Sequence, residues 1–129
     1  MIDWRGALYV VLGGGIGSLA RYVTGIAMVQ RFGPGFPYGT LTINVLGSFL
    51  IGIVSQLALT RAFGVTPNLR LFLTVGVLGG FTTFSTFSFE TVTLAGEGAP
   101  TLGALYVAAS VGLGTIAAFA GIVLARIAI

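Results

Sequence analysis

Four long apolar stretches dominate this chain and limit what it can fold into. Residues 37–60, 71–89 and 98–125 contain no charged residue, and residues 6–30 contain only Arg21. A helix needs about 20 mostly apolar residues to cross a bilayer, and each stretch is about that length or longer. The apolar runs are continuous rather than alternating, which disfavours a β-barrel. We therefore expect an all-α membrane protein with four transmembrane helices.

The connections between these stretches are short. Residues 31–37 hold two prolines and two glycines, and residues 61–70 and 96–100 form the other two connections. Short loops make consecutive helices antiparallel neighbours. We predict one four-helix transmembrane domain over residues 1–129, in the cell (inner or plasma) membrane. Its expected spans are about 6–30, 37–60, 70–96 and 99–126.

The composition excludes several classes of protein. Charged residues make up 7% of the chain, and there is no His and no Cys. Haem anchors, zinc sites, Fe–S clusters and cysteine or serine–histidine nucleophiles are therefore excluded. Without lysine or a basic run, nucleic-acid binding is not expected. A membrane enzyme would need an acid–base set, which Glu90 alone does not supply, so we expect no enzymatic activity.

The third stretch is abnormal at its centre, where residues 79–88 read GGFTTFSTFS. Adjacent glycines and β-branched threonines are poor helix formers, so we expect this helix to break at mid-membrane. A break frees backbone carbonyls, which persist only against protein or a water- or ion-filled cavity and can bind Na⁺ or K⁺. The alternative is a kinked packing helix whose hydroxyls bond back to the backbone. The Gly13/Gly17 pair in the first stretch is typical of close helix packing.

Polar and aromatic side chains gather beyond the expected break. Phe84 and Phe87 are three residues apart and share one helix face, while Thr83, Thr86 and Glu90 form a polar line on a helix. An ionisable group inside a span is a functional candidate. Glu90 lies about seven residues from the span centre, or roughly 10 Å, which suits a vestibule. It could also be an end residue that reaches toward water.

Other polar side chains lie inside the remaining stretches. Asn44 brings an amide to the second stretch, where it could serve an ion or make an interhelical hydrogen bond. Tyr106 and Ser110 share a face of the fourth stretch, with simple packing as the alternative. Arg21 could reach toward water, pair with Glu90 or a partner chain, or attract anions, and the sequence does not choose between these.

These side chains are rich in hydrogen-bond donors and include no ring of acids. A bare anion in a low dielectric is costly unless donors replace its water, and the edge of a phenylalanine ring is the positive end of its quadrupole. The residues therefore favour a pore for a small anion, with a structural cation at the helix break. They do not name the anion.

Three segments in register resemble the Fluc (CrcB) fluoride channel family. They are residues 14–22 (GGIGSLARY), 38–48 (YGTLTINVLGS) and 79–90 (GGFTTFSTFSFE), and the resemblance covers all four spans in order. It implies a fluoride-selective channel that exports the toxic anion passively. It also implies an antiparallel, dual-topology homodimer with two pores along the subunit interface.

The resemblance also implies roles for individual residues. The ring edges of Phe84 and Phe87 would meet fluoride, and Asn44 would be the pore amide. Thr40 and Glu90 would lie near a pore entrance, a vestibule to which we also assign Arg21. The polar lining would include Ser85, Thr86, Tyr106 and Ser110. The carbonyls of Gly79 and Thr82 from both subunits would hold one buried Na⁺ that is not transported.

Two alternatives stay open at this point. A small proton-coupled multidrug exporter is also a four-helix antiparallel dimer, but it would need an acid in the first span, where this chain has none. The arginines also favour one orientation, because Arg5, Arg61, Arg70 and Arg126 fall on one side and mainly Arg31 on the other. A second chain of opposite bias is therefore the alternative to a second copy of this chain.

Overall fold

The structure, a computed structural model, describes residues 3–129, and these residues form helices without a strand. Four helical segments are long and apolar enough to cross a membrane. The expected all-α class with four candidate spans is therefore confirmed. The segments are Trp4–Phe32, Tyr38–Leu59, Pro67–Gly96 and Pro100–Ile127.

The first, second and fourth segments are the uninterrupted helices α1 (Trp4–Phe32), α2 (Tyr38–Leu59) and α6 (Pro100–Ile127). The Asp3 side chain caps α1 by accepting from the Arg5 N–H at 3.1 Å. Gly33 ends α1 with a φ of 81°, a conformation that suits glycine. Pro100 begins α6, because its fixed φ fits the first helical turn.

The third segment is built from several pieces rather than one regular helix. They are α3 (Pro67–Leu71), the π-helix η2 (Phe72–Leu78), α4 (Gly79–Phe81) and α5 (Phe84–Gly96), and a short 3₁₀ turn, η1 (Ala62–Gly64), precedes them. The wide π turns of η2 were not expected from the sequence, since hydrophobic pattern does not separate α from π geometry. π turns are rare and often occur at functional sites.

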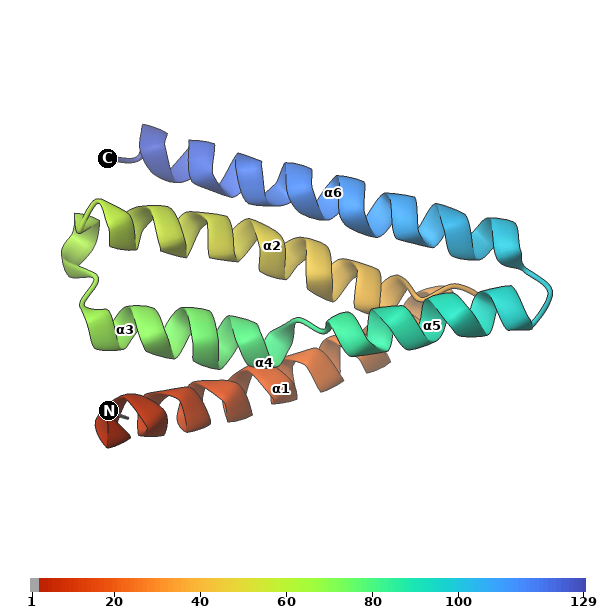
Figure 1. Cartoon of the computed structure of the whole chain (residues 1–129), viewed down its shortest axis with the longest axis horizontal. Helices are drawn as coiled ribbons and strands as arrows, with labels where there is room; N and C mark the ends of the chain where they lie inside the picture. The colour runs from red at the N-terminus through yellow and green to blue at the C-terminus, as the bar shows by residue number, and fades with distance from the viewer. Residues whose placement is uncertain (1–2) are drawn as a thin grey trace.

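The helices lie side by side, and both ends of the chain lie at one end of the bundle (Figure 1). In this view α2 lies between α6 and the third segment, while α1 runs beneath α3 and α4. The buried apolar side chains of the described residues are few: Ile43, Leu78, Phe81, Tyr106 and Ala125. Most large apolar side chains face outward, as expected for a chain whose surroundings are lipid or a second subunit.

Glycine allows close contact between α1 and the third segment. An added Cβ at Gly13 would lie 3.0 Å from Gly76 Cα, and one at Gly17 would collide with the Val77 carbonyl. Helices in lipid associate through such small residues because their backbones can then approach closely. The packing role predicted for Gly13 and Gly17 is therefore confirmed.

We expect Gly17→Ala to destabilise the protein, because the new methyl would collide with the Val77 carbonyl and lie 2.8 Å from the Phe81 nitrogen. Overpacking of this kind costs about 1–3 kcal/mol. Thermal unfolding in detergent measures the effect. Gly15→Ala is the matched control, since its methyl meets nothing within 4 Å and alanine favours the helix. Equal unfolding temperatures for the two variants would contradict the packing argument.

Candidate ion-conduction site

Two extended threonines separate α4 from α5. Thr82 has φ −80° and ψ 157°, and Thr83 has φ −151° and ψ 118°. Gly79 and Gly80 are themselves helical, so the extended pair lies just after them, at the β-branched residues. Threonine loses rotamer freedom in a helix and tolerates the extended region well, which accounts for this position.

The polar backbone groups of this pair bond to side chains from α1 and α2 and to one backbone carbonyl of η2. The Thr82 N–H donates to the Leu78 carbonyl at 3.0 Å, and the Thr82 carbonyl accepts from Arg21 Nη1 at 3.3 Å. The Thr83 N–H donates to Asn44 Oδ1 at 2.9 Å, while Asn44 Nδ2 donates to the Thr83 carbonyl at 3.0 Å. The Asn44 amide therefore pairs with Thr83 in both directions, as a neighbouring strand would.

This arrangement frees two carbonyls from their usual helical partners. In a continuous helix the Thr83 N–H would bond to the Gly79 carbonyl, but here it bonds to Asn44. The Thr86 N–H would bond to the Thr82 carbonyl, but here it donates to Thr83 Oγ1 at 3.2 Å. Gly79 and Thr82 both line a cavity of about 400 Å³.

The structure answers two questions that the sequence left open. Asn44 makes the interhelical hydrogen bonds that were the alternative to an ion-binding role, so at most one of its N–H groups is free for a ligand. Arg21 donates to the Thr82 carbonyl, a partner that was not among the expected ones. Its guanidinium thus lies next to the interruption in the third segment.

Hydroxyl groups at the start of α5 bond mostly to one another. Thr83 Oγ1 donates to Thr86 Oγ1 at 3.0 Å and lies 3.2 Å from Ser85 Oγ. Ser88 Oγ bonds back to the Phe84 carbonyl at 3.0 Å, as the packing-helix alternative expected. The cluster therefore caps α5 and holds Ser85 and Thr86 next to the extended pair.

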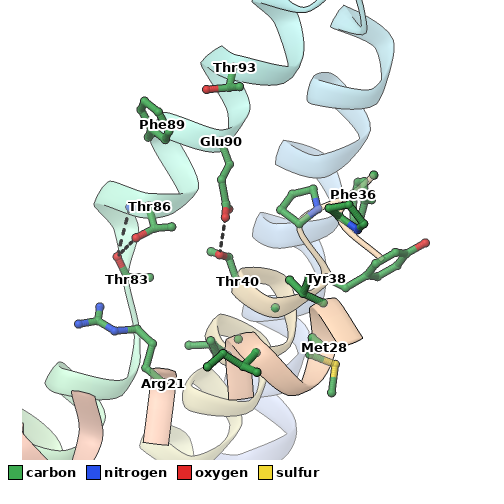
Figure 2. Close-up of a pocket in the computed structure, with 18 of the residues that line it drawn as sticks. Arg21, Met28, Phe36, Tyr38, Thr40, Thr83, Thr86, Phe89, Glu90 and Thr93 are labelled. Atoms are coloured by element: carbon green, nitrogen blue, oxygen red, sulfur yellow. Dashed lines mark hydrogen bonds between the residues drawn. The ribbon is translucent and has the colours of Figure 1, made fainter. Parts of the chain in front are cut away.

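Glu90 is held by two donors from other helices. Thr40 Oγ1 donates to Glu90 Oε1 at 2.9 Å (Figure 2), and the Tyr106 hydroxyl donates to Oε2 at 2.7 Å. Thr40 is buried, and Tyr106 is 0% exposed. Glu90 is thus fixed to α2 and α6 by two hydrogen bonds while its half-buried side chain lines the larger cavity. Because the Tyr106 proton is directed to Glu90, that hydroxyl does not donate elsewhere in this arrangement.

Most of the candidate residues line one of two cavities, and Ser85 and Tyr106 line neither. The larger, about 890 Å³, is lined by Arg21, Thr40, Thr86 and Glu90 among others, and several of these surround it in Figure 2. The smaller cavity is lined by Phe84 and Phe87 from α5, by the Asn44 amide from α2 and by the Ser110 hydroxyl from α6, among others. Thr83 lines both cavities, so the extended pair lies between them.

The smaller cavity has an unsatisfied donor and an exposed aromatic ring. Ser110 Oγ is buried and has no hydrogen-bond partner among residues 3–129. The rings of Phe84 and Phe87 lie 5.6 Å apart between centroids, tilted by 50°. Phe84 is 78% exposed, so its own chain barely packs against it. These groups are available to a ligand or to another subunit.

Sequence reasoning missed part of the larger cavity. Thr93 and Glu97 also line it, and they extend the polar line of Thr83, Thr86 and Glu90 to the end of α5. The helical spacing of these five residues could have shown this. The loop residue Phe36, which also lines the cavity, gave no comparable signal, because a single aromatic in a turn has no periodic pattern.

Comparison with known proteins finds one family model and several relatives that match most of the chain. The family model described as "CrcB-like protein, Camphor Resistance (CrcB)" matches residues 8–122. A protein of Rhizobium meliloti (strain 1021) named "Fluoride-specific ion channel FluC" is 49% identical over 119 residues, which cover 92% of this chain and 94% of the relative. A protein of the same name from Allorhizobium ampelinum is 46% identical over 122 residues, with 95% and 97% covered. Another from Rhizobium etli is 48% identical over 120 residues, with 93% and 95% covered.

Proposed function

Because the chain belongs to the CrcB-like protein family, we propose that it is a fluoride-selective channel that lets fluoride leave the cell passively. The observation that carries this proposal is near-complete coverage of relatives named as fluoride-specific ion channels, at 46–49% identity. The protein is accordingly a multi-pass protein of the cell membrane and a channel rather than an enzyme.

The chemistry of the smaller cavity supports conduction of a small anion. Ser110 supplies a buried hydroxyl with no partner in the described chain, and Phe84 and Phe87 supply ring edges. A dehydrated anion needs such donors and positive edges in place of its water. We assign these residues and the remaining N–H of Asn44 to the fluoride path. Ser85 and Thr86 form the hydroxyl cluster with Thr83 beside it, and Tyr106, whose hydroxyl bonds to Glu90, packs its ring against Phe87.

The larger cavity suits a vestibule. Its lining combines the Arg21 cation with Thr40, Thr86 and the carboxylate of Glu90. Thr40 and Tyr106 hold that carboxylate against the helix bundle, which limits its repulsion of an incoming anion. Arg21 would raise the local anion concentration at the interruption, because its charge lies among low-dielectric walls.

An antiparallel homodimer with a pore on each side of the interface would complete this path. The exposed Phe84 and the small number of buried apolar side chains support the need for a second subunit. In that assembly the interruptions of the two third segments would meet at mid-membrane. Arg5 lies at the start of α1, Arg61 and Arg70 lie just before η1 and in α3, and Arg126 lies at the end of α6. These parts of the chain lie at the end of the bundle that holds both termini (Figure 1), which favours one orientation, so a partner of opposite bias is the competing arrangement.

A structural Na⁺ at the interruption fits the residues present. The Gly79 carbonyl has lost its helical partner to Asn44, and the Thr82 carbonyl has lost its own to the Thr83 hydroxyl. Each carbonyl oxygen has two lone pairs, so Thr82 can accept from Arg21 and still offer one. Two carbonyls from each of two chains would give a set of four hard oxygens. When bound, the cation would neutralise these dipoles and join the subunits without being transported.

We expect the dimer in detergent to melt at a lower temperature when Na⁺ is replaced by N-methylglucamine at constant ionic strength. A ligand present at 100 times its Kd contributes about 2.7 kcal/mol to stability, a change that thermal unfolding resolves easily. Replacement of chloride by gluconate at constant Na⁺ is the control. An unfolding temperature that is the same with and without Na⁺ would contradict the proposed cation site.

The proposed function is tested by anion efflux from proteoliposomes that contain the purified protein. Fluoride and chloride are compared side by side. We expect fast fluoride loss, negligible chloride loss and no requirement for a proton gradient. A folded dimer without fluoride flux would contradict the channel. Transport that appears only with a proton gradient would instead favour the multidrug-exporter alternative.

A further inference from the structure

A continuous row of aromatic rings runs from the smaller cavity to the connection between α1 and α2. The ring centroids of Phe84 and Phe87 are 5.6 Å apart, and those of Phe87 and Tyr106 are 5.2 Å apart. Tyr106 then meets Phe36 at 5.4 Å, and Phe36 meets Tyr38 at 4.8 Å. The contacts that involve Tyr106 are edge-to-face, at 61° and 80°, a geometry in which each ring restricts the rotation of the next.

The connection holds Phe36 in place with little freedom. Pro34 and Pro37 lie on either side of it, and proline fixes its own φ and restricts the residue before it. The Tyr38 N–H also donates to the Phe36 carbonyl at 2.8 Å. The Phe36 ring therefore presents a stable surface to Tyr106.

Tyr106 can transmit this constraint because it is held on all sides. Its side chain is fully buried, and its hydroxyl donates to Glu90 at 2.7 Å. Its ring lies between Phe36 and Phe87. A ring fixed at its hydroxyl and packed at both edges has little room to turn unless one of these neighbours is lost.

We propose that Phe36 is a positioning residue for conduction, because its ring orients Tyr106 and, through Tyr106, the Phe87 ring of the fluoride path. The proposal rests on the channel function proposed above. Phe36 lies outside the smaller cavity but lines the larger one, so the tests below separate action through the row from a direct effect on the vestibule.

The test compares Phe36→Leu with Phe32→Leu in the proteoliposome assay. Phe32, the last residue of α1, is the matched control, because its ring meets Tyr38 at 5.2 Å and is not in the contact between Phe36 and Tyr106. We expect Phe36→Leu to lower fluoride efflux about fivefold, which is the fold-change equivalent to losing the interaction free energy of one aromatic pair. Phe32→Leu should leave efflux unchanged, and Phe36→Tyr, which keeps the ring, should restore it. Equal effects of the two leucine variants would overturn the proposal.

Two further readouts separate positioning from general stability. In a Tyr106→Leu background, Phe36→Leu should cause no additional loss of flux, and a further fivefold loss would contradict action through Tyr106. The second readout uses protein in which 3-fluorotyrosine replaces the 4 tyrosines. The ¹⁹F resonance that is missing from the spectrum of Tyr106→Phe belongs to position 106 and reports on the environment of the Tyr106 ring. It should shift in Phe36→Leu and stay in place in Phe32→Leu.

The ¹⁹F measurement needs no ion flux. Wild-type protein that shows no fluoride efflux would therefore contradict the channel function. An unshifted Tyr106 resonance in Phe36→Leu would contradict the positioning role alone. If Tyr106→Leu does not fold, Phe87→Leu supplies the second background, with the same expectation that Phe36→Leu adds nothing.

Discussion

Phe84→Ile is expected to reduce fluoride efflux by about 100-fold or more, with the protein still folded. The ring is 78% exposed on its own chain, so its replacement leaves little unfilled space in the fold. Isoleucine offers no positive ring edge, and an anion that faces it must give up hydration without compensation. Burial of a polar group without a partner costs about 2–7 kcal/mol, and about 2.7 kcal/mol already corresponds to a hundredfold change.

The control for this variant is Phe119→Ile. Phe119 lies on α6, is 67% exposed and lines neither cavity. Its replacement removes the same ring from a surface outside both cavities and therefore outside the proposed fluoride path, so efflux should stay near the wild-type rate. An elution volume and a melting temperature equal to those of the wild type verify folding of both variants. Wild-type flux through Phe84→Ile would remove Phe84 from the path.

Asn44→Asp is expected to impair both flux and stability. The native amide accepts from the Thr83 N–H and donates to the Thr83 carbonyl, and aspartate can only do the first. A carboxylate oxygen would then face that carbonyl near 3.0 Å without a proton between them. Loss of a buried partner costs about 1–3 kcal/mol, and the new negative charge also repels the anion in the same cavity.

For Asn44→Asp we therefore expect at least about a hundredfold loss of fluoride efflux together with a lower melting temperature. Asn68→Asp is the control, since it adds the same charge at an exposed position in α3. The combined effect distinguishes Asn44 from Phe84, whose replacement should alter flux alone. A rise in flux, or a loss of flux with unchanged stability, would argue against the paired role of the Asn44 amide.

Much of the fold followed from local pattern. The spans expected at about 37–60 and 99–126 correspond to the helical segments Tyr38–Leu59 and Pro100–Ile127. The glycines Gly13 and Gly17 predicted close packing, which the structure confirms against η2 and α4. The π turns of η2 were not predictable, because hydrophobic spacing does not distinguish π from α geometry.

The site was predictable in its residues more than in its contacts. Asn44, Phe84, Phe87 and Ser110 were singled out from the sequence, and the structure brings them to one cavity. Ser85 lines neither cavity and instead joins the hydroxyl cluster that caps α5. The hydroxyl of Tyr106, expected to face the path, is committed to Glu90.

The sequence by itself determined the solvent and the chemistry of this protein. Long apolar runs require a lipid environment. The absence of His and Cys excludes most catalytic and redox chemistry. The segment GGFTTFSTFS at residues 79–88 is where a helix is least favoured. Only the tertiary structure decided which atoms satisfy that weak point. Arg21 and Asn44 bond to Thr82 and Thr83 across 61 and 39 residues of chain, respectively. Such pairings depend on how the helices meet in space, and no local pattern along the chain records them.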